Sequence, residues 1–280
     1  MSTSIDRADP ARTTPADIRP GRNTVLELLL LLLLVPASDA APEPAAPVPS
    51  TPTPHFTTVD GPFQPHFNGM TGQRHFPEMM GAGGALVDVD GDGDLDLYQL
   101  QGALIASGET LADVRLPGGA KVPKTLPSDR LYRNLMVESG RLAFKDVTAD
   151  SGLMAEADGA YGYGMSVAAG DIDNDGDVDL YVANLGPDQL WRNRGDGAFD
   201  NVTASAFARV PGGWSAAAAF VDLDADGWLD LYVVRYVDFR ADDPPTCFAT
   251  DSRADYCGPD AFAPLTDRLY RNRGDGTFED

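Results

Sequence analysis

The residues in this sequence with the clearest chemical potential are aspartates that recur in three loops of nine residues. The loops read DVDGDGDLD from Asp88, DIDNDGDVD from Asp171 and DLDADGWLD from Asp222. Positions 1, 3, 5 and 9 carry a carboxylate in every copy: Asp88, Asp90, Asp92 and Asp96; Asp171, Asp173, Asp175 and Asp179; Asp222, Asp224, Asp226 and Asp230. Alternating carboxylates in a curled loop can point inward together and bind a divalent cation.

Calcium is the cation that this pattern favours, because it takes roughly six to eight oxygen ligands in a flexible arrangement. The glycine at position 6 permits the sharp reversal that wraps the loop around an ion. Position 7 usually contributes its backbone carbonyl, so its side chain is free to vary, and it is Asp94, Asp177 or Trp228. Magnesium fits less well, because it demands stricter octahedral geometry. We therefore predict about three calcium ions, one in each loop.

Two other interpretations of these aspartate-rich loops are less favoured: a metal-free turn and a helix–loop–helix calcium site. A metal-free, solvated acidic turn would leave four closely spaced carboxylates that repel one another. A helix–loop–helix calcium site needs a glutamate at loop position 12, where this chain has Gln99, Val182 and Val233. The loops are also followed by Leu-Asp-Leu-Tyr, whose alternation is typical of a strand.

Each loop belongs to a longer repeat, which determines the elements that position it. A second motif follows each loop, from Asp129, Asp188 and Asp267, and a third follows from Phe144, Phe199 and Phe278. The order is the same in all three copies, and each copy can form four short antiparallel strands. The sequence therefore predicts an all-β fold of β-propeller blades, with blades over roughly 81–150, 164–204 and 215–280.

Three blades are fewer than the typical minimum of about four in a closed propeller. We therefore expect these blades to be part of a larger propeller rather than an open arc. Residues 55–60 resemble the motif of a fourth strand, and we read them as a strand that completes another blade. The first and third copies also carry long insertions between their second and third strands.

The N-terminal region predicts export. Arginines at 7, 12, 19 and 22 precede an apolar run from Leu28 to Val35, and small residues follow up to Ala41. This order is typical of a signal peptide, here residues 1–40, and the run is shorter than the roughly 20 residues that span a bilayer. Residues 41–54 are a proline-rich linker, and the folded part is 55–280. We expect a secreted, periplasmic or cell-surface protein without a membrane span in the mature chain.

The net charge indicates which binding partners are excluded, and the two cysteines bear on the cellular compartment. The chain has 43 acidic and 21 basic residues, a net charge of −22, which argues against binding to nucleic acid or anionic lipid. Cys247 and Cys257 would be free thiols in the cytosol, but in an exported protein we expect a disulfide between them. A zinc site is disfavoured, because no second Cys/His pair stands nearby to complete four ligands.

The three acidic loops, the LYRN and LWRN strands, the NRGDG-x-F turns and the segment 256–259 resemble the FG-GAP/VCBS repeat family of integrin-α-type propellers. More narrowly, they resemble its exported, cartilage-acidic-protein-like group, which often ends in an ASPIC/UnbV domain. The resemblance covers about residues 55–280. It implies a seven-bladed, extracellular propeller with calcium in its blade hairpins, mostly linked to adhesion or ligand binding.

These observations predict a non-enzymatic, calcium-stabilised scaffold for binding or adhesion, with an unknown protein or glycan ligand. One alternative is an enzyme, since propellers host hydrolases and lyases in their central channels. Its active site would lie outside this sequence, in which we find no acid–base pair or nucleophile beyond the acidic loops. A third alternative is a purely structural propeller that presents another domain.

Overall fold

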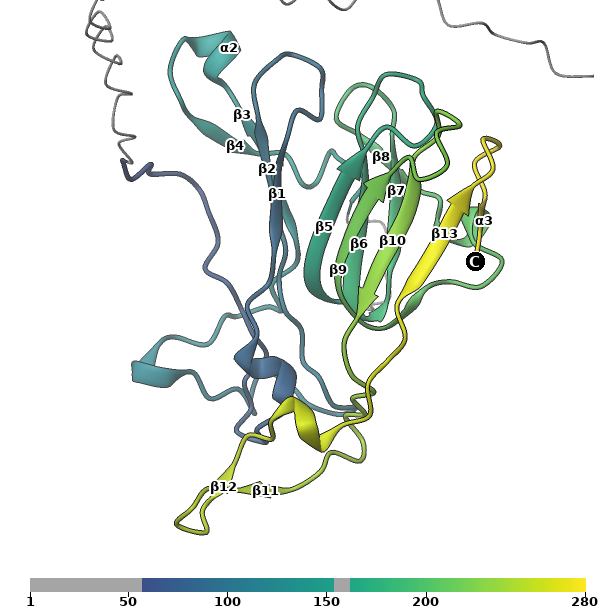
Figure 1. Cartoon of the computed structure of the whole chain (residues 1–280). Coiled ribbons are helices and arrows are strands. Elements are labelled where there is room, and N and C mark those ends of the chain that lie inside the picture. Colours follow the sequence, from purple (N-terminus) through teal and green to yellow (C-terminus); the bar gives the residue numbers. More distant parts are fainter. Residues whose placement is uncertain (1–56, 154–161) are drawn as a thin grey trace, which may run out of the picture. The chain divides into compact units, whose positions relative to one another are not determined.

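The structure, a computed structural model, describes residues 57–153 and 162–280 (Figure 1). The predicted signal peptide and the proline-rich linker lie outside the described residues. All elements given below belong to one compact unit, Thr58–Asp280.

The first repeat forms one antiparallel sheet of four strands, paired in the order of the sequence. Each strand is short, and the first acidic loop joins the first two. The strands are β1 (Gly84–Val87), β2 (Asp96–Gln99), β3 (Arg130–Asn134) and β4 (Phe144–Asp146). The last aspartate of the acidic loop is therefore also the first residue of β2.

The second and third repeats have the same four-stranded pattern. The second repeat contains β5 (Tyr163–Gly170), β6 (Asp179–Pro187), β7 (Gln189–Asn193) and β8 (Phe199–Asn201). The third contains β9 (Gly212–Val221), β10 (Asp230–Arg235), β13 (Arg268–Asn272) and β14 (Phe278–Glu279). The end of β6 pairs with the start of β9, at Leu185 with Trp214 and Pro187 with Gly212, so the two repeats are joined into one larger sheet.

The remaining elements are short and lie before the first repeat, between its last two strands, between repeats or in the two insertions. They are η2 (Phe76–Met79), η3 (Pro117–Gly119), α2 (Met136–Ser139), α3 (Thr203–Ala206), β11 (Cys247–Phe248), β12 (Ala254–Asp255) and η4 (Pro259–Ala261). Within 57–153 and 162–280, none of the helices has the length and apolar character needed to cross a bilayer.

Successive repeats pack against each other through buried apolar side chains. One cluster joins the first repeat to the second and includes Tyr98, Leu131 and Trp191. Another joins the second to the third and includes Leu190 and Tyr270. Burial of each repeat's apolar face against its neighbour is the packing that a repeat architecture requires. The prediction of an all-β, propeller-like fold of four-stranded antiparallel repeats is confirmed.

The two insertions lie at the end of the sheets opposite the acidic loops (Figure 1), because they follow the second strand of their repeats. A segment before the first repeat packs against the third-repeat insertion. The ring of Phe76 stacks on Phe262 with centroids 5.4 Å apart, and the Tyr256 hydroxyl donates to Glu78 Oε2 at 2.8 Å. These contacts tie the insertion to the body of the protein.

The predicted completing strand over 55–60 is not formed by its described part, since residues 57–60 lie in no strand. Instead, the residues that follow cover the first repeat with side chains: the Phe63 ring meets those of Tyr132 at 5.3 Å and Phe144 at 5.2 Å. Pro62 and Pro65 flank this contact and lack the N–H groups that a strand ladder needs.

Candidate metal-binding loops

The aspartate at position 9 ties each loop to the third strand of its repeat. Asp96, Asp179 and Asp230 are all buried, with at most 3% of their surface exposed. One carboxylate oxygen accepts a hydrogen bond from the backbone N–H at position 2, at 3.0 to 3.2 Å. The other accepts from the backbone N–H of the asparagine that ends the LYRN motif, at 2.8 to 2.9 Å. This carboxylate therefore holds the loop in place whether or not an ion is bound.

The aspartates at positions 1 and 5 curl the loop on itself. In the first copy, Asp88 accepts from the backbone N–H groups of Asp92 at 3.2 Å and Gly93 at 2.9 Å. Asp92 in turn accepts from the N–H of Asp94 at 3.0 Å. The other two copies repeat these bonds. The glycine at position 6 has φ between 89° and 98°, a left-handed conformation that glycine adopts without strain.

The carboxylate at position 3 is held less well than those at positions 1, 5 and 9. Asp90 has a side chain only 7% exposed, and its Oδ1 has no hydrogen-bond partner among the described residues. Asp173 Oδ1 is likewise buried and unpartnered within the described part of the chain. A buried carboxylate oxygen without a donor is unfavourable. These oxygens are therefore the strongest sign that the loops are built to receive a cation.

The carboxylates converge in each loop. In each loop, three aspartates each offer a carboxylate oxygen, and these oxygens lie within 4.8 Å of one another. The three sets are Asp88, Asp90 and Asp96; Asp171, Asp173 and Asp179; and Asp222, Asp224 and Asp226. A further set joins Asp92 and Asp94 to Glu138 of α2. Clusters of hard anionic oxygens of this kind suit calcium. The donor chemistry of the loops fits a divalent cation.

Burial raises the pKa of the Asp96 carboxyl group to about 6 and that of the Asp179 carboxyl group to about 7. Hydrogen bonds from backbone amides oppose this rise, and the neighbouring aspartates add to it. Burial also raises the pKa of Asp90 and Asp173. The loops thus concentrate negative charge that is poorly compensated by the chain itself, and a bound dication would favour the ionised forms.

An arginine from the third strand reaches the loop in two of the three repeats. Arg133 Nη2 lies 2.5 Å from Asp90 Oδ2, and Arg271 Nη2 lies 2.5 Å from Asp224 Oδ2. In the second repeat, the equivalent Arg192 contacts Asp200 of β8 instead, at 4.0 Å. The first and third loops therefore form an ion pair with their arginine, whereas Arg192 pairs with Asp200 and acts on Asp173 of the second loop through its charge at longer range.

All fifteen predicted ligand residues lie in these three loops, as their spacing requires. At position 7, Asp94 Oδ1 is buried without a partner among the described residues, and Oδ2 accepts from the N–H of Val137 at 2.9 Å. Asp177 and Trp228 lie close to the glycines of the NRGDG turns, Gly195 and Gly274. The ligand role of each residue remains a prediction.

Two groups of residues with clear roles were missed by the sequence reasoning. The asparagines that end the LWRN and LYRN motifs also bond to the preceding repeat: Asn193 Nδ2 donates to the Val89 carbonyl and Asn272 Nδ2 to the Ile172 carbonyl, both at 2.8 Å. The aspartates that begin these motifs accept from a tyrosine hydroxyl and a backbone N–H, as Asp188 does from Tyr181 and Asn184. The same aspartate and asparagine occur at these motif positions in all three repeats, and this repetition could have indicated their structural role.

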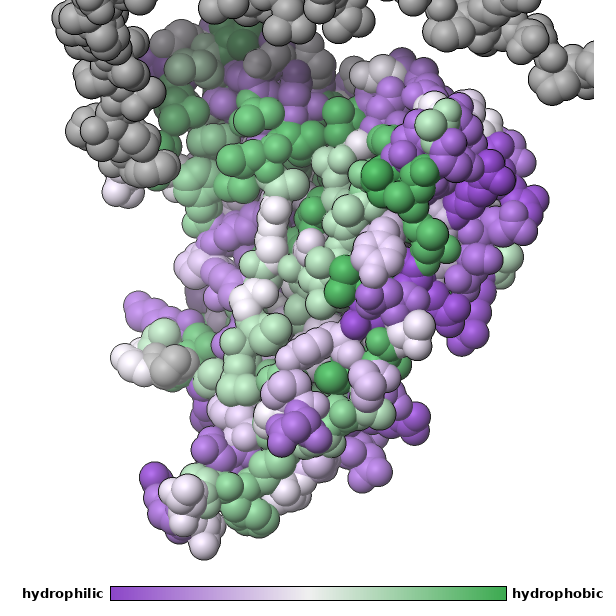
Figure 2. Space-filling model, viewed as in Figure 1, coloured by the Kyte–Doolittle hydropathy of each residue, from purple (hydrophilic) through white to green (hydrophobic). Residues whose placement is uncertain are grey.

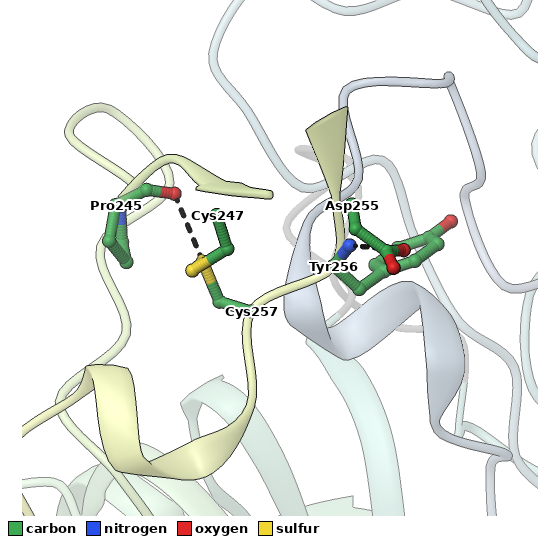
Figure 3. The surroundings of a disulfide bond; sticks show 5 residues. All are labelled: Pro245, Cys247, Asp255, Tyr256 and Cys257. Atoms are coloured by element: carbon green, nitrogen blue, oxygen red, sulfur yellow. Dashed lines mark hydrogen bonds between the residues drawn. A yellow bond between two sulfur atoms is a disulfide. The ribbon is translucent and has the colours of Figure 1, made fainter. Parts of the chain in front are cut away.

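The cysteines lie in the third-repeat insertion, away from the loops. Cys247 and Cys257 form a disulfide with an S–S distance of 2.04 Å (Figure 3). The sulfur of Cys257 lies 3.3 Å from the Pro245 carbonyl oxygen. The disulfide closes the short β11–β12 hairpin, in which Cys247 pairs with Asp255.

Comparison with known proteins agrees with these features. The family model described as FG-GAP-like repeat matches residues 171–233, from the second acidic loop into β10. Human cartilage acidic protein 1 is 34% identical over 93 residues, which are 33% of this chain and 13% of that relative. The matched stretch is thus a small part of the relative's length. The resemblance to FG-GAP repeats noted from the sequence is confirmed.

Proposed function

Starting from a chain that carries an FG-GAP-like repeat in a propeller-like fold, we propose that its acidic loops bind calcium and stabilise an exported, non-enzymatic binding scaffold. In each loop the aspartates at positions 1, 3, 5 and 9 and the carbonyl at position 7 would hold the ion. The single observation that carries the proposal is the buried, unpartnered oxygen of Asp90, which recurs at Asp173. The ion would supply the positive charge that these oxygens lack.

The bonds around the loops explain why an ion would matter for the whole protein. Each loop is bonded to its own third strand through the position-9 aspartate. The first and second loops also accept a bond from the asparagine of the next repeat. An ion that binds the ordered loop stabilises the folded state by mass action, and through these bonds it supports the stacking of repeats.

Two features support the proposed scaffold role: the type of repeat, and the two insertions as a surface where a partner could bind. FG-GAP repeats are typical of non-enzymatic scaffolds, and the two insertions lie at the end of the sheets away from the acidic loops. We propose that a protein or glycan partner binds there. The disulfide of the insertion supports export, because such bonds persist in oxidising compartments. The acidic surface supports a partner other than nucleic acid.

Calorimetric titration of calcium into the chelator-stripped chain tests the metal proposal, with magnesium as the comparison. We expect about three sites with micromolar to millimolar affinity, and weaker binding of magnesium. The second loop should bind most tightly, since the arginine contacts seen at the first and third loops are not found there.

A matched pair of variants assigns the binding to the loops. Asp173→Asn should remove one site, whereas Asp196→Asn should leave the number of sites unchanged, because Asp196 lies in the nearby NRGDG turn and bonds only the N–H of Ala198. Circular dichroism of each variant establishes that it is folded. A folded wild-type protein that takes up no calcium would contradict the proposal.

A further inference from the structure

A cavity of about 540 Å³ lies between the second and third repeats, at the end of the sheets opposite the acidic loops. The end of β6, the connection 207–213 and the end of β14 form its walls. A cavity of this size is in the range of small-molecule sites. No acidic loop, predicted ligand or disulfide lines it, so the features described above do not explain it.

Three arginines line this cavity, although the chain as a whole has a net charge of −22: Arg209, Arg235 and Arg268. Three carboxylates are close to them: Asp280, Asp188 and Asp267, whose Oδ1 accepts from the backbone N–H of Arg235 at 2.8 Å. Asp280 pairs with Arg268 at 2.8 Å, and Asp188 is buried nearby, where it accepts from Tyr181, Asn184 and Ser215. For Arg209, which is exposed, no carboxylate lies within 4.0 Å in the described ranges. The cavity therefore brings three guanidinium groups together, of which Arg268 is paired with Asp280.

The guanidinium of Arg235 is poorly satisfied by hydrogen-bond acceptors in the part of the chain that the structure describes. Its Nη1 makes one long hydrogen bond, 3.4 Å, to the Thr266 carbonyl. Its Nε is buried and has no acceptor among the residues that the structure describes. Gly213 leaves room for the guanidinium, since a Cβ there would lie 2.7 Å from Arg235 Nη2. The Nη end of this guanidinium, held by one long bond at the cavity wall, is suited to bind an oxyanion.

Comparison between the repeats shows that the blade motif does not require an arginine here. Arg235 occupies the place that Gln101 and Asn184 take in the first and second repeats. In all three, the backbone N–H donates to the aspartate that begins the next motif, and Arg235 does so to Asp267 at 2.8 Å. The shared structural role is performed by the backbone. The charged side chain is particular to the third repeat.

We propose that this cavity is an anion site that binds the carboxylate or sulfate group of a small organic ligand. Arg235 and Arg209 bind the oxyanion, since in the described part of the chain neither makes an ion pair within 4.0 Å, as Arg268 does with Asp280. Phe207 and Tyr270 give the cavity an apolar wall for the rest of the ligand. This site is independent of the calcium loops, and its failure would leave the metal proposal untouched.

The test uses the full chain labelled with ¹⁵N-arginine, kept in calcium, at constant ionic strength in sodium chloride. Sodium benzoate, sodium sulfate and the neutral benzyl alcohol are titrated in turn, and the Arg235 Nε–H signal is followed by NMR. Benzoate and sulfate should shift this signal with saturation, and benzyl alcohol should not. Stronger binding of benzoate would identify an organic carboxylate as the ligand, and stronger binding of sulfate a sulfated one.

Variants decide whether the arginines form the site. Arg235→Gln restores the residue type of the first repeat and should weaken binding at least tenfold, as read from the Arg209 signal. Arg209→Gln, an exposed substitution, should weaken it severalfold and keeps the test valid if Arg235→Gln does not fold. Arg253→Gln is the control, since Arg253 is exposed and pairs with Asp251 in the insertion. A shift without saturation, or equal affinity in all four proteins, would overturn the proposal.

Discussion

In the second repeat, Tyr181 is fully buried and its hydroxyl donates to Asp188, whereas in the third repeat the equivalent Tyr232 is 38% exposed and donates to Asp267. The two hydrogen bonds are alike, at 2.8 and 2.6 Å. The surroundings are not, because Leu190 is fully buried and the equivalent Leu269 is 47% exposed. The hydrophilic colouring around the loops of these two repeats is visible in Figure 2.

This comparison separates two determinants of the same motif. The hydrogen bonds follow from the residues of one repeat and are therefore reproduced in each copy. Burial depends on the neighbouring repeats: the described second repeat packs against both the first and the third. The same side chain should therefore contribute differently to the free energy of unfolding in different repeats. The following four predictions test this.

The largest effect is expected from Asp179→Ala in the second repeat. The substitution leaves the buried N–H groups of Ile172 and Asn193 without an acceptor. We expect a loss of roughly 2 to 5 kcal/mol in the free energy of unfolding, measured by urea denaturation with chelator present so that metal loss does not contribute. The exposed Asp196→Ala is the control. A loss below about 1 kcal/mol would mean that the loop is not held by this carboxylate.

Asn193→Ala should destabilise more than Asn134→Ala. Both asparagines donate to a carbonyl of their own repeat, but Asn193 also donates to Val89 of the preceding repeat. The difference in unfolding free energy should be about 1 kcal/mol, the usual contribution of one hydrogen bond. Equal losses would show that the bond between repeats adds nothing.

Tyr181→Phe should cost about 1 kcal/mol, since the buried Asp188 loses one of its donors while Ser215 still donates to it. Tyr232→Phe should change stability much less, because water can replace the hydroxyl at the partly exposed Asp267. Thermal or urea unfolding of the two variants gives the comparison. A larger loss for Tyr232→Phe would contradict the assignment of burial as the cause.

The smallest effects are expected in the pH dependence of stability, where the two aspartates should differ in sign. Burial raises the pKa of Asp188, so its contribution is present at low pH and is lost as pH rises above the ordinary value near 3.8. The Tyr232 hydrogen bond lowers the pKa of Asp267, so its contribution is present above that value and is lost as pH falls.

Unfolding of chelator-treated Asp188→Asn and Asp267→Asn between about pH 3 and 8, a range that brackets the usual carboxyl pKa near 4, measures these contributions. Relative to the wild type, Asp188→Asn should gain stability as pH rises, and Asp267→Asn should lose it. Parallel curves for both variants would mean that burial does not distinguish the two sites.

Much of the architecture could be predicted because the repeats encode local structure. The motifs located the four strands of each copy, and the aspartate spacing located the loops. The completing strand expected at 55–60 remains a prediction, because it would pair with another blade; its described part, residues 57–60, forms no strand here. Asn193 and Asp188 were missed because their partners lie in other segments, and the position of Val89 relative to Asn193 cannot be read from spacing.

The sequence by itself determined the curl of each acidic loop, because the bonds of Asp88, Asp171 and Asp222 reach amides only four and five residues away. It also determined the glycine at each reversal. Only the tertiary structure decided which carboxylates are buried, and that Arg133 meets its loop while Arg192 meets β8. It also brought Arg209 and Arg235 together at one cavity. Local hydrogen bonds follow from spacing along the chain, whereas burial and charge pairing depend on which repeats and connections pack together.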